Sequence, residues 1–130
     1  MSVKLLGWAE PEQILEGAGI LRKACDVLDE QGWIQNEYVD RDGRCCMVGA
    51  MRVAKYGLDG PLPTSFSFDE PTTIAYGIFS RVAGIHPPMY NDTQGRTVTD
   101  VKAKMIEVAE YAEREVKQWR AKQTPEVSGH

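Results

Sequence analysis

No hydrophobic stretch of the sequence is long enough to cross a bilayer, because charged residues interrupt every apolar run. The N-terminal stretch also lacks the basic and apolar regions of a secretory signal, since its single lysine is followed by Glu10 and Glu12. We therefore expect a cytoplasmic protein that makes no contact with membranes.

Cysteine and histidine are scarce, with three and two copies. Cys25 stands alone, and the adjacent residues Cys45 and Cys46 are too close to form an unstrained disulfide with each other. The sequence also lacks the Cys-x-x-Cys and His-x-x-x-His spacings that are typical of structural zinc sites. We expect reduced thiols, no metal ion and no cofactor.

Positive charge is sparse as well. The 19 acidic residues outnumber the 15 basic ones, which gives a net charge of -4. No segment gathers lysine and arginine densely enough to neutralise a row of phosphates. The sequence therefore argues against a nucleic-acid partner, including recognition through a helix-turn-helix.

What is present is enough for one folded domain, because a chain of 130 residues, 42% of them hydrophobic, can bury its own core. Apolar residues recur at helical spacing, which predicts four helices near residues 11–31, 46–56, 72–83 and 97–122. We expect an all-α fold, a compact four-helix domain over residues 1–122 with long loops and at most one short β-hairpin near residues 36–46. Residues 123–130 are predicted to form a disordered tail. The predicted core includes Leu21, Leu28, Trp33, Met51, Ile78, Val101, Met105 and Val108.

Several local signals refine this fold. Gly17 and Gly19 lie inside the first predicted helix, and we attribute both to close packing against another element. Thr97 and Asp100 have the spacing of a capping box at the start of the last helix. The exposed side of that helix carries acidic residues four positions before basic ones, among them the predicted pair of Glu113 with Lys117.

One group of residues fits nucleophilic catalysis. Cys45 or Cys46 at the start of a short helix would be held partly as a thiolate, with His86 as the base and Asn91 or Asp92 as its orienting group. The surrounding sequence lacks a known cysteine-protease motif, and an unpaired cysteine usually packs as a small apolar residue. We therefore name no catalytic residue and keep a small cysteine-dependent enzyme as the alternative. In either case we expect Cys25, on an apolar helix stripe, to react more slowly than Cys45 or Cys46.

The two long loops, Gly57 to Pro71 and Ile85 to Arg96, are the predicted binding surface, because they carry side chains that are common in protein interfaces. The candidate partner-binding residues are Phe66, Phe68, Met89, Tyr90, Asn91, Asp92 and Arg96. A purely structural account fits the same residues, with the aromatic rings capping the core, an Asx turn, and an arginine bonded to nearby carbonyl groups. The charged outer face of the last helix is the competing surface.

Several short motifs follow one another along the chain: Leu21-x-x-Ala24, Gly32-Trp33-x-Gln35 with Tyr38, Gly43-x-Cys45-Cys46-x-x-Gly49-Ala50, and Tyr90-Asn91-Asp92-x-x-Gly95-Arg96-Thr97 with Val101. Their order resembles a small uncharacterised family found in actinobacteria and their phages. The resemblance spans roughly Gln13 to Ala112 and implies a compact, mainly helical domain with no assigned activity and no catalytic or ligand residues to carry over.

We therefore expect a non-enzymatic protein-binding or accessory protein, encoded by a phage and acting on a host protein or in an assembly. Its partner is a protein, and the chain itself is a monomer or a small homo-oligomer. If a phage encodes it, its place is the host cytoplasm.

Overall fold

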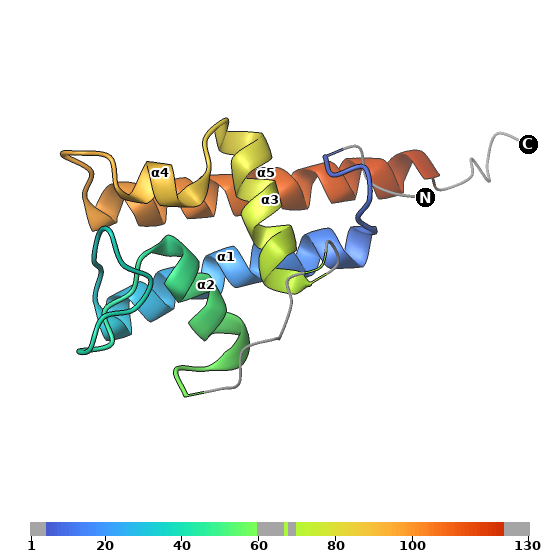
Figure 1. Cartoon of the computed structure of the whole chain (residues 1–130). Coiled ribbons are helices and arrows are strands. Elements are labelled where there is room, and N and C mark those ends of the chain that lie inside the picture. The colour runs from blue at the N-terminus through green and yellow to red at the C-terminus, as the bar shows by residue number, and fades with distance from the viewer. Residues whose placement is uncertain (1–4, 60–66, 68–69, 124–130) are drawn as a thin grey trace, which may run out of the picture.

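The structure, a computed structural model, describes residues 5–59, 67 and 70–123. This part of the chain contains five helices and no sheet, which confirms the all-α fold (Figure 1). The helices are α1 (Pro11–Gln31), α2 (Met47–Tyr56), α3 (Pro71–Ala83), α4 (Pro87–Asn91) and α5 (Val98–Gln123). The predicted tail lies almost wholly outside the described residues, apart from Gln123 at the end of α5.

The sequence predicts four helices, and the structure contains the short helix α4 in addition to them. Ile85 to Arg96 is predicted to be a loop, but within it Pro87 and Pro88 occupy the first positions of α4. Proline suits that place because the first amides of a helix have no partner within the helix and its fixed φ matches the helix.

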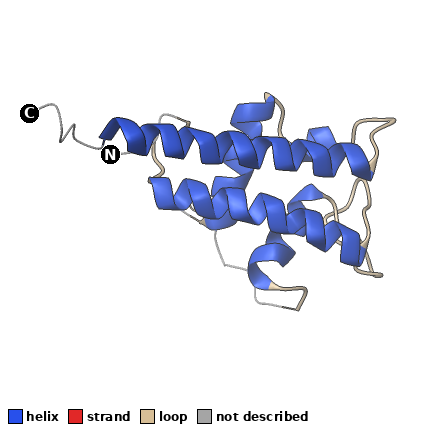
Figure 2. Cartoon of the chain, turned by 180° about the vertical axis from the view of Figure 1, so that it is seen from behind, coloured by secondary structure: helices blue, strands red, loops and turns tan. Residues whose placement is uncertain are grey.

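The two long helices α1 and α5 lie side by side and antiparallel, while α2 and α3 pack on α1 (Figures 1 and 2). Ion pairs join Asp29 to Lys102, Arg22 to Glu113 and Glu12 to Arg120, so positions that ascend along α1 descend along α5. Glu113 therefore bonds across to α1 rather than to Lys117, which corrects the pair predicted within α5. The guanidinium of Arg22 reaches both carboxylate oxygens, at 2.7 and 2.9 Å, and a bidentate pair is the stronger arrangement.

The core lies where α1 meets α2, α3 and α5. Seven of the eight predicted core residues are buried: Leu21, Leu28, Met51, Ile78, Val101, Met105 and Val108. The eighth, Trp33, is only partly buried, because its indole lies at the edge of the core and Nε1 donates a hydrogen bond to Asn91. The spacing of apolar residues thus located the core correctly.

Gly17 marks the closest approach of α1 to α3. A Cβ at this position would lie 2.8 Å from Cδ1 of Ile78 and 3.0 Å from Cγ2 of Ile74, so any side chain here would have to displace these isoleucines. Gly19 differs, since no atom lies within 4 Å of the place its Cβ would occupy. Close packing therefore explains the first glycine, and the explanation was wrong for the second.

The start of α5 shows the predicted capping box. The amide of Thr97 donates to Oδ2 of Asp100 at 3.0 Å, and the amide of Asp100 donates to Oγ1 of Thr97 at 3.1 Å. Within the described ranges, none of the helices combines the length and the apolar content that a membrane span requires.

Candidate functional site

The loop between α1 and α2 folds back on itself as a short hairpin-like turn. The amide of Asp40 donates to the carbonyl of Arg44, and the amide of Gly43 donates to the carbonyl of Asp40, both at 3.0 Å. In this loop only isolated β-bridges form, from Cys45 to Val39 and to Trp33. The expected short hairpin is therefore present as a turn without regular strands.

Asn91, at the end of α4, holds this loop in place through its side-chain hydrogen bonds. Its side chain is fully buried, and Oδ1 accepts from Nε1 of Trp33 at 2.7 Å and from the amide of Met47 at 3.1 Å. Its Nδ2 donates to the carbonyl of Ile34 at 3.2 Å and to Oδ1 of Asp92 at 2.8 Å. One side chain thus joins α4, the loop and the first turn of α2, whose amides lack partners within the helix.

Asp92 and Gln35 complete this attachment. Oδ1 of Asp92 accepts from the amide of Asn36 at 2.9 Å, and Asn36 has a left-handed backbone with φ of 69°. Asparagine tolerates that conformation better than most residues. Nε2 of Gln35 donates to the carbonyls of Asn91 and Thr93 at 3.0 and 3.1 Å. These hydrogen bonds therefore fix the path of the backbone into the turn.

The backbone of the same loop also packs directly on α2. A Cβ at Gly49 would collide with the carbonyl oxygen of Tyr38 and lie 3.1 Å from Cγ2 of Val39. The same carbonyl accepts from the amide of Cys46 at 3.0 Å. With its backbone against the helix, the loop turns two large side chains outward, and Tyr38 is 55% exposed and Val39 42% exposed.

Three hollows open around Tyr38, and together they form what we call the Tyr38 face. The acidic hollow, of about 250 Å³, is lined by Asn36, Glu37, Tyr38, Cys46, Pro88 and Asp92. The apolar hollow, of about 320 Å³, is lined by Tyr38, Val39, Gly49, Arg52, Val53, Gly57 and Leu58. The middle hollow lies between α2 and α3 and is lined by Tyr38, Val48, Met51, Arg52, Thr72, Thr73, Tyr76 and Pro88.

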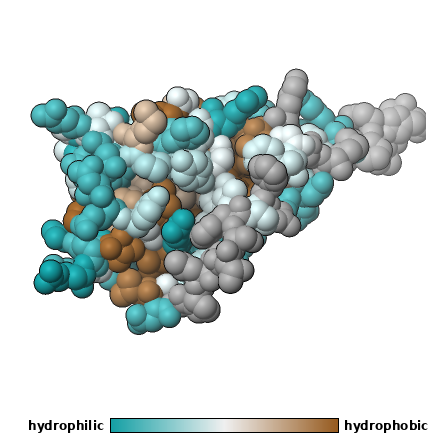
Figure 3. All heavy atoms as spheres, viewed as in Figure 1, coloured by the Kyte–Doolittle hydropathy of each residue, from teal (hydrophilic) through white to brown (hydrophobic). Residues whose placement is uncertain are grey.

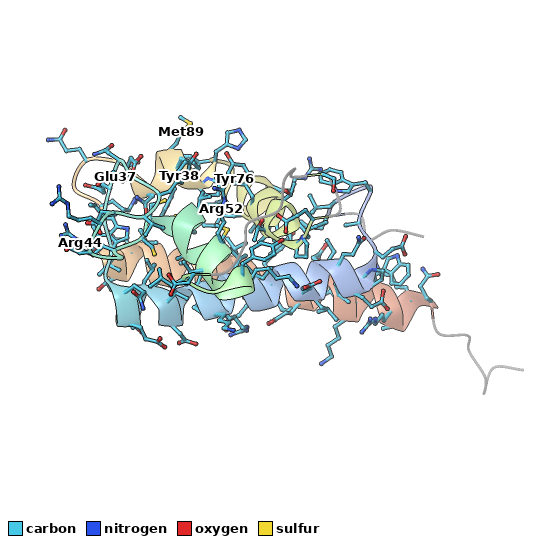
Figure 4. All side chains as sticks on the ribbon, turned by 60° about the horizontal axis from the view of Figure 1, so that its bottom comes forward. Glu37, Tyr38, Arg44, Arg52, Tyr76 and Met89 are labelled. Atoms are coloured by element: carbon cyan, nitrogen blue, oxygen red, sulfur yellow. The ribbon has the colours of Figure 1, made fainter. Side chains whose placement is uncertain are left out.

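The chemistry of this face is mixed. Leu58 is 48% exposed beside Tyr38 and Val39, and hydrophobic atoms gather over α2 and the chain that follows it (Figure 3). The guanidinium of Arg52 lies 5.1 Å from the centre of the Tyr38 ring, within the range of a cation–π contact. Figure 4 places Tyr38, Arg52 and Tyr76 together on one side of the molecule, with Met89 nearby.

Of the predicted partner-binding residues, Met89 is 62% exposed and Asp92 lines the acidic hollow. Tyr90 and Asn91 are buried within this chain, so their side chains present little surface to a partner. The guanidinium of Arg96 stacks 3.7 Å from the centre of the Tyr90 ring, and its Nε donates to the Tyr90 carbonyl at 3.0 Å. Tyr90 packs in the core and Arg96 bonds to a carbonyl, as the structural account expects, whereas Asn91 bonds to Trp33 and Met47 rather than forming an Asx turn.

Phe66 and Phe68, the remaining candidates, lie outside the described residues. The ends of their loop are joined by a carboxylate. Glu70 accepts from the phenol of Tyr56 at 2.6 Å and from the amide and hydroxyl of Thr72 at the start of α3. Burial alone would raise the pKa of Glu70, but these hydrogen bonds outweigh it and hold that pKa below its usual value. Burial and the bond to this carboxylate raise the pKa of Tyr56 to about 12.

All three cysteines are buried, and Cys45 is the least exposed of them. Burial raises the pKa of Cys25 and of Cys45 to about 11, and it also raises the pKa of Cys46. The expectation that Cys45 or Cys46 is more reactive than Cys25 therefore has no support in their exposure. Cys46 instead caps α2, because its Sγ accepts from the amide of Gly49 at 3.4 Å.

The structure does not bring His86 together with a cysteine. Its Nδ1 lies 3.0 Å from Oγ of Ser80, and its ring stacks on Tyr76 with 5.7 Å between the ring centres. His86 lines a hollow formed by the N-terminal segment and α3, whereas Cys46 lines the acidic hollow. The arrangement shows no nucleophile–base pair among these predicted residues.

Sequence reasoning missed most of the Tyr38 face. The usable signal was the pair of large side chains at Tyr38 and Val39 directly before a turn, followed by a small residue, Gly49, inside a helix. Nothing in the spacing showed that these positions would meet, since the contact depends on how the loop packs on α2.

The structure thus defines an all-α domain in which a fixed loop presents an aromatic and apolar surface. The chain belongs to DUF6197, a family of unknown function, which matches residues 14–111. That range begins in α1 and ends in α5, so it includes the whole Tyr38 face. No curated protein and no solved structure matches the chain.

Proposed function

We propose that this chain is a non-enzymatic protein-binding or accessory protein that acts through the Tyr38 face. The observation that carries the proposal is the grouping of three large exposed side chains, Tyr38, Val39 and Leu58, around the apolar hollow. Contiguous apolar surface with polar residues at its edge is typical of sites where other proteins bind.

The residue types support the same reading. Tyrosine, arginine and methionine are enriched in protein interfaces, and the face presents Tyr38, Arg52 and Tyr76. The exposed Met89 directly follows Pro88, which lines two of the three hollows. The hydrogen bonds of Asn91 and the contact at Gly49 hold the loop in place before any partner arrives. A surface that is already ordered loses less conformational entropy on binding, so its contacts contribute more to affinity.

The cellular setting is part of this proposal. The resemblance of the motif order supports a protein of actinobacteria or their phages, working in the cytoplasm of the cell or of the infected host. Its partner would be a host protein or a component of an assembly, with the chain itself a monomer or a small homo-oligomer. The net charge of -4 favours protein over nucleic acid as the partner.

A pull-down with the folded protein as bait, from extracts of the cell that encodes it or of the phage host, tests the proposal. Tyr38→Ala should abolish capture, whereas Tyr111→Ala should not, because Tyr111 is an exposed aromatic residue of α5 outside the Tyr38 face. Equal capture by both variants would place the interface elsewhere. If no protein is retained by the wild type, the binding function itself is contradicted.

A further inference from the structure

We propose that the partner of the Tyr38 face is a protein segment that inserts a lysine or arginine side chain into the acidic hollow. The same segment places an aliphatic side chain in the apolar hollow, on the other side of Tyr38. This inference rests on the proposed function and specifies the chemistry of its partner.

The acidic hollow has two carboxylates available to a cation. Asp92 uses Oδ1 to accept from Asn36 and Asn91, while its Oδ2 bonds to no described residue. Glu37 is exposed and makes no hydrogen bond or ion pair within the described part of the chain. No basic side chain lines this hollow in the structure as described, so its negative charge is not neutralised from within.

Arg41, the arginine nearest to Glu37 in the sequence, is exposed and does not line the hollow, whereas Arg44 and Arg96 are already engaged. Two nitrogens of the Arg44 guanidinium lie 2.7 Å from a carboxylate oxygen of Asp40, and Arg96 is stacked on Tyr90. Both are therefore held by other groups. A cation from a partner would supply the missing charge, and complementary charge across an interface speeds encounter and selects the partner.

The walls of the acidic hollow fit a long cationic side chain better than a small ion. The ring of Tyr38 and the pyrrolidine of Pro88 line it beside the carboxylates. Lysine and arginine pack their methylene stems against such apolar surfaces while the charged end reaches polar groups. The Tyr38 ring also attracts a cation over its face.

The linings of the hollows set the direction in which the segment lies. Arg52 lines the apolar and middle hollows but not the acidic one, and no carboxylate is among the described residues that line the apolar hollow. Val39, Val53 and Leu58 there offer contacts to an aliphatic side chain. The cation therefore enters beside Glu37, and the neutral side chain lies beside Leu58.

Selection of a displayed library of short random peptides on the wild-type protein, followed by affinity measurements on the enriched peptides, tests the inference. We expect these peptides to share a lysine or arginine together with an aliphatic residue. Replacing the cation by glutamine should weaken binding about tenfold or more, and so should Glu37→Lys, because a close opposite charge becomes a like charge.

Glu110→Lys is the matched control, since it makes the same charge change at an exposed position of α5 and should leave the affinity within about twofold. A peptide whose cation is replaced by glutamate should bind Glu37→Lys better than the wild type. Circular dichroism of each variant confirms that it is folded before the affinities are compared.

Four results would overturn the inference. The first is that the enriched peptides contain no cation, and the second is that Glu37→Lys leaves their affinity unchanged. In either case the proposed function still stands if Tyr38→Ala abolishes binding of the peptides. A wild-type dimer in sedimentation that Tyr38→Ala dissociates would show that a second copy of the chain covers the face. Failure to enrich any peptide would exclude a linear segment as the partner, while the pull-down tests the proposed function separately.

Discussion

Two glycines of α1, two positions apart, have opposite physical reasons. Gly17 lies under the side chains of Ile74 and Ile78 of α3, whereas Gly19 is exposed with open space where a Cβ would be. A glycine inside a helix costs about 1 kcal/mol relative to alanine, because the unfolded chain has more freedom to lose. At Gly17 that cost is offset by the close helix contact; at Gly19 nothing in the structure offsets it.

We therefore expect Gly19→Ala to raise the free energy of unfolding by about 0.5–1 kcal/mol. Gly17→Ala should lower it by about 1–3 kcal/mol, because a methyl group forces α1 and α3 apart. Urea denaturation of both variants measures the two changes, and each variant serves as the control for the other. A loss of stability in Gly19→Ala would show that its position is constrained by a contact that α1 lacks in this structure.

Asn91 is the residue on which the geometry of the site depends most. Asn91→Ala should lower the free energy of unfolding by about 2–4 kcal/mol, because the indole N–H of the partly buried Trp33 and the buried amide of Met47 lose their acceptor. Gln94→Ala, at an exposed position of the same loop, is the control and should change stability by less than about 0.5 kcal/mol. Equal values from thermal or urea unfolding would contradict the role given to Asn91.

At the scale of the element, the start of α3 depends on the ionised form of Glu70. Its folded-state pKa lies below the usual value, so its contribution to stability is present above the unfolded-state pKa and is lost as the pH falls through the folded-state pKa. Glu70→Gln should therefore be less stable than the wild type near neutral pH. The difference should shrink on acidification, as measured by unfolding free energies across the acidic range; a difference independent of pH would contradict this account.

Tyr56 joins the end of α2 to the same carboxylate, and its contribution to stability is lost at high pH instead of low pH. Its folded-state pKa is about 12 against an ordinary value of 10.0, so the protonated phenol is favoured in the folded state. The resulting stability is complete below the ordinary value and is lost as the pH rises through about 12. Tyr56→Phe should remove this alkaline loss, and the check is the slope of unfolding free energy against pH in that range.

The elements themselves were largely predictable from the sequence, because periodic apolar residues and terminal proline or glycine mark α1 and α3 directly. The failure at α4 came from two prolines that suit either a break or a helix start. The role of Asn91 could not be predicted, since its partners Trp33 and Met47 are distant in the sequence. Only tertiary packing decides that a turn-forming residue type is buried there.

At the scale of the whole molecule, α1 and α5 lie side by side, and α2, α3 and α4, which help to build the Tyr38 face, cover one face of this pair, in front of it in Figure 1 and behind it in Figure 2. The sequence predicted that a surface on loops would be exposed, and Met89 and Asp92 do lie at the surface. It could not predict which loop would be central, because the exposure of Tyr38 follows from a carbonyl packed on Gly49. Loops positioned by such a scaffold commonly carry binding residues.

The burial of all three thiols makes alkylation a measure of how the whole domain opens. A thiol with a pKa of about 11 has only about one molecule in a thousand as thiolate near pH 8, and the buried sulfur must also become accessible. We therefore expect Cys25 and Cys45 to be labelled slowly in the native protein, with rates that rise together in mild denaturant as the domain unfolds. Peptide mass mapping after timed alkylation measures each site separately.

The same measurement separates the two functional hypotheses. A cysteine-dependent enzyme needs one thiol that reacts quickly and stoichiometrically without denaturant and slows in His86→Ala. The structure places the nearest polar contact of His86 at Ser80, so His86→Ala should leave the labelling of Cys45 and Cys46 in the folded protein unchanged. Ser80→Ala is the control for any general loosening of this region, and fast labelling lost only in His86→Ala would favour the enzyme over the binding protein.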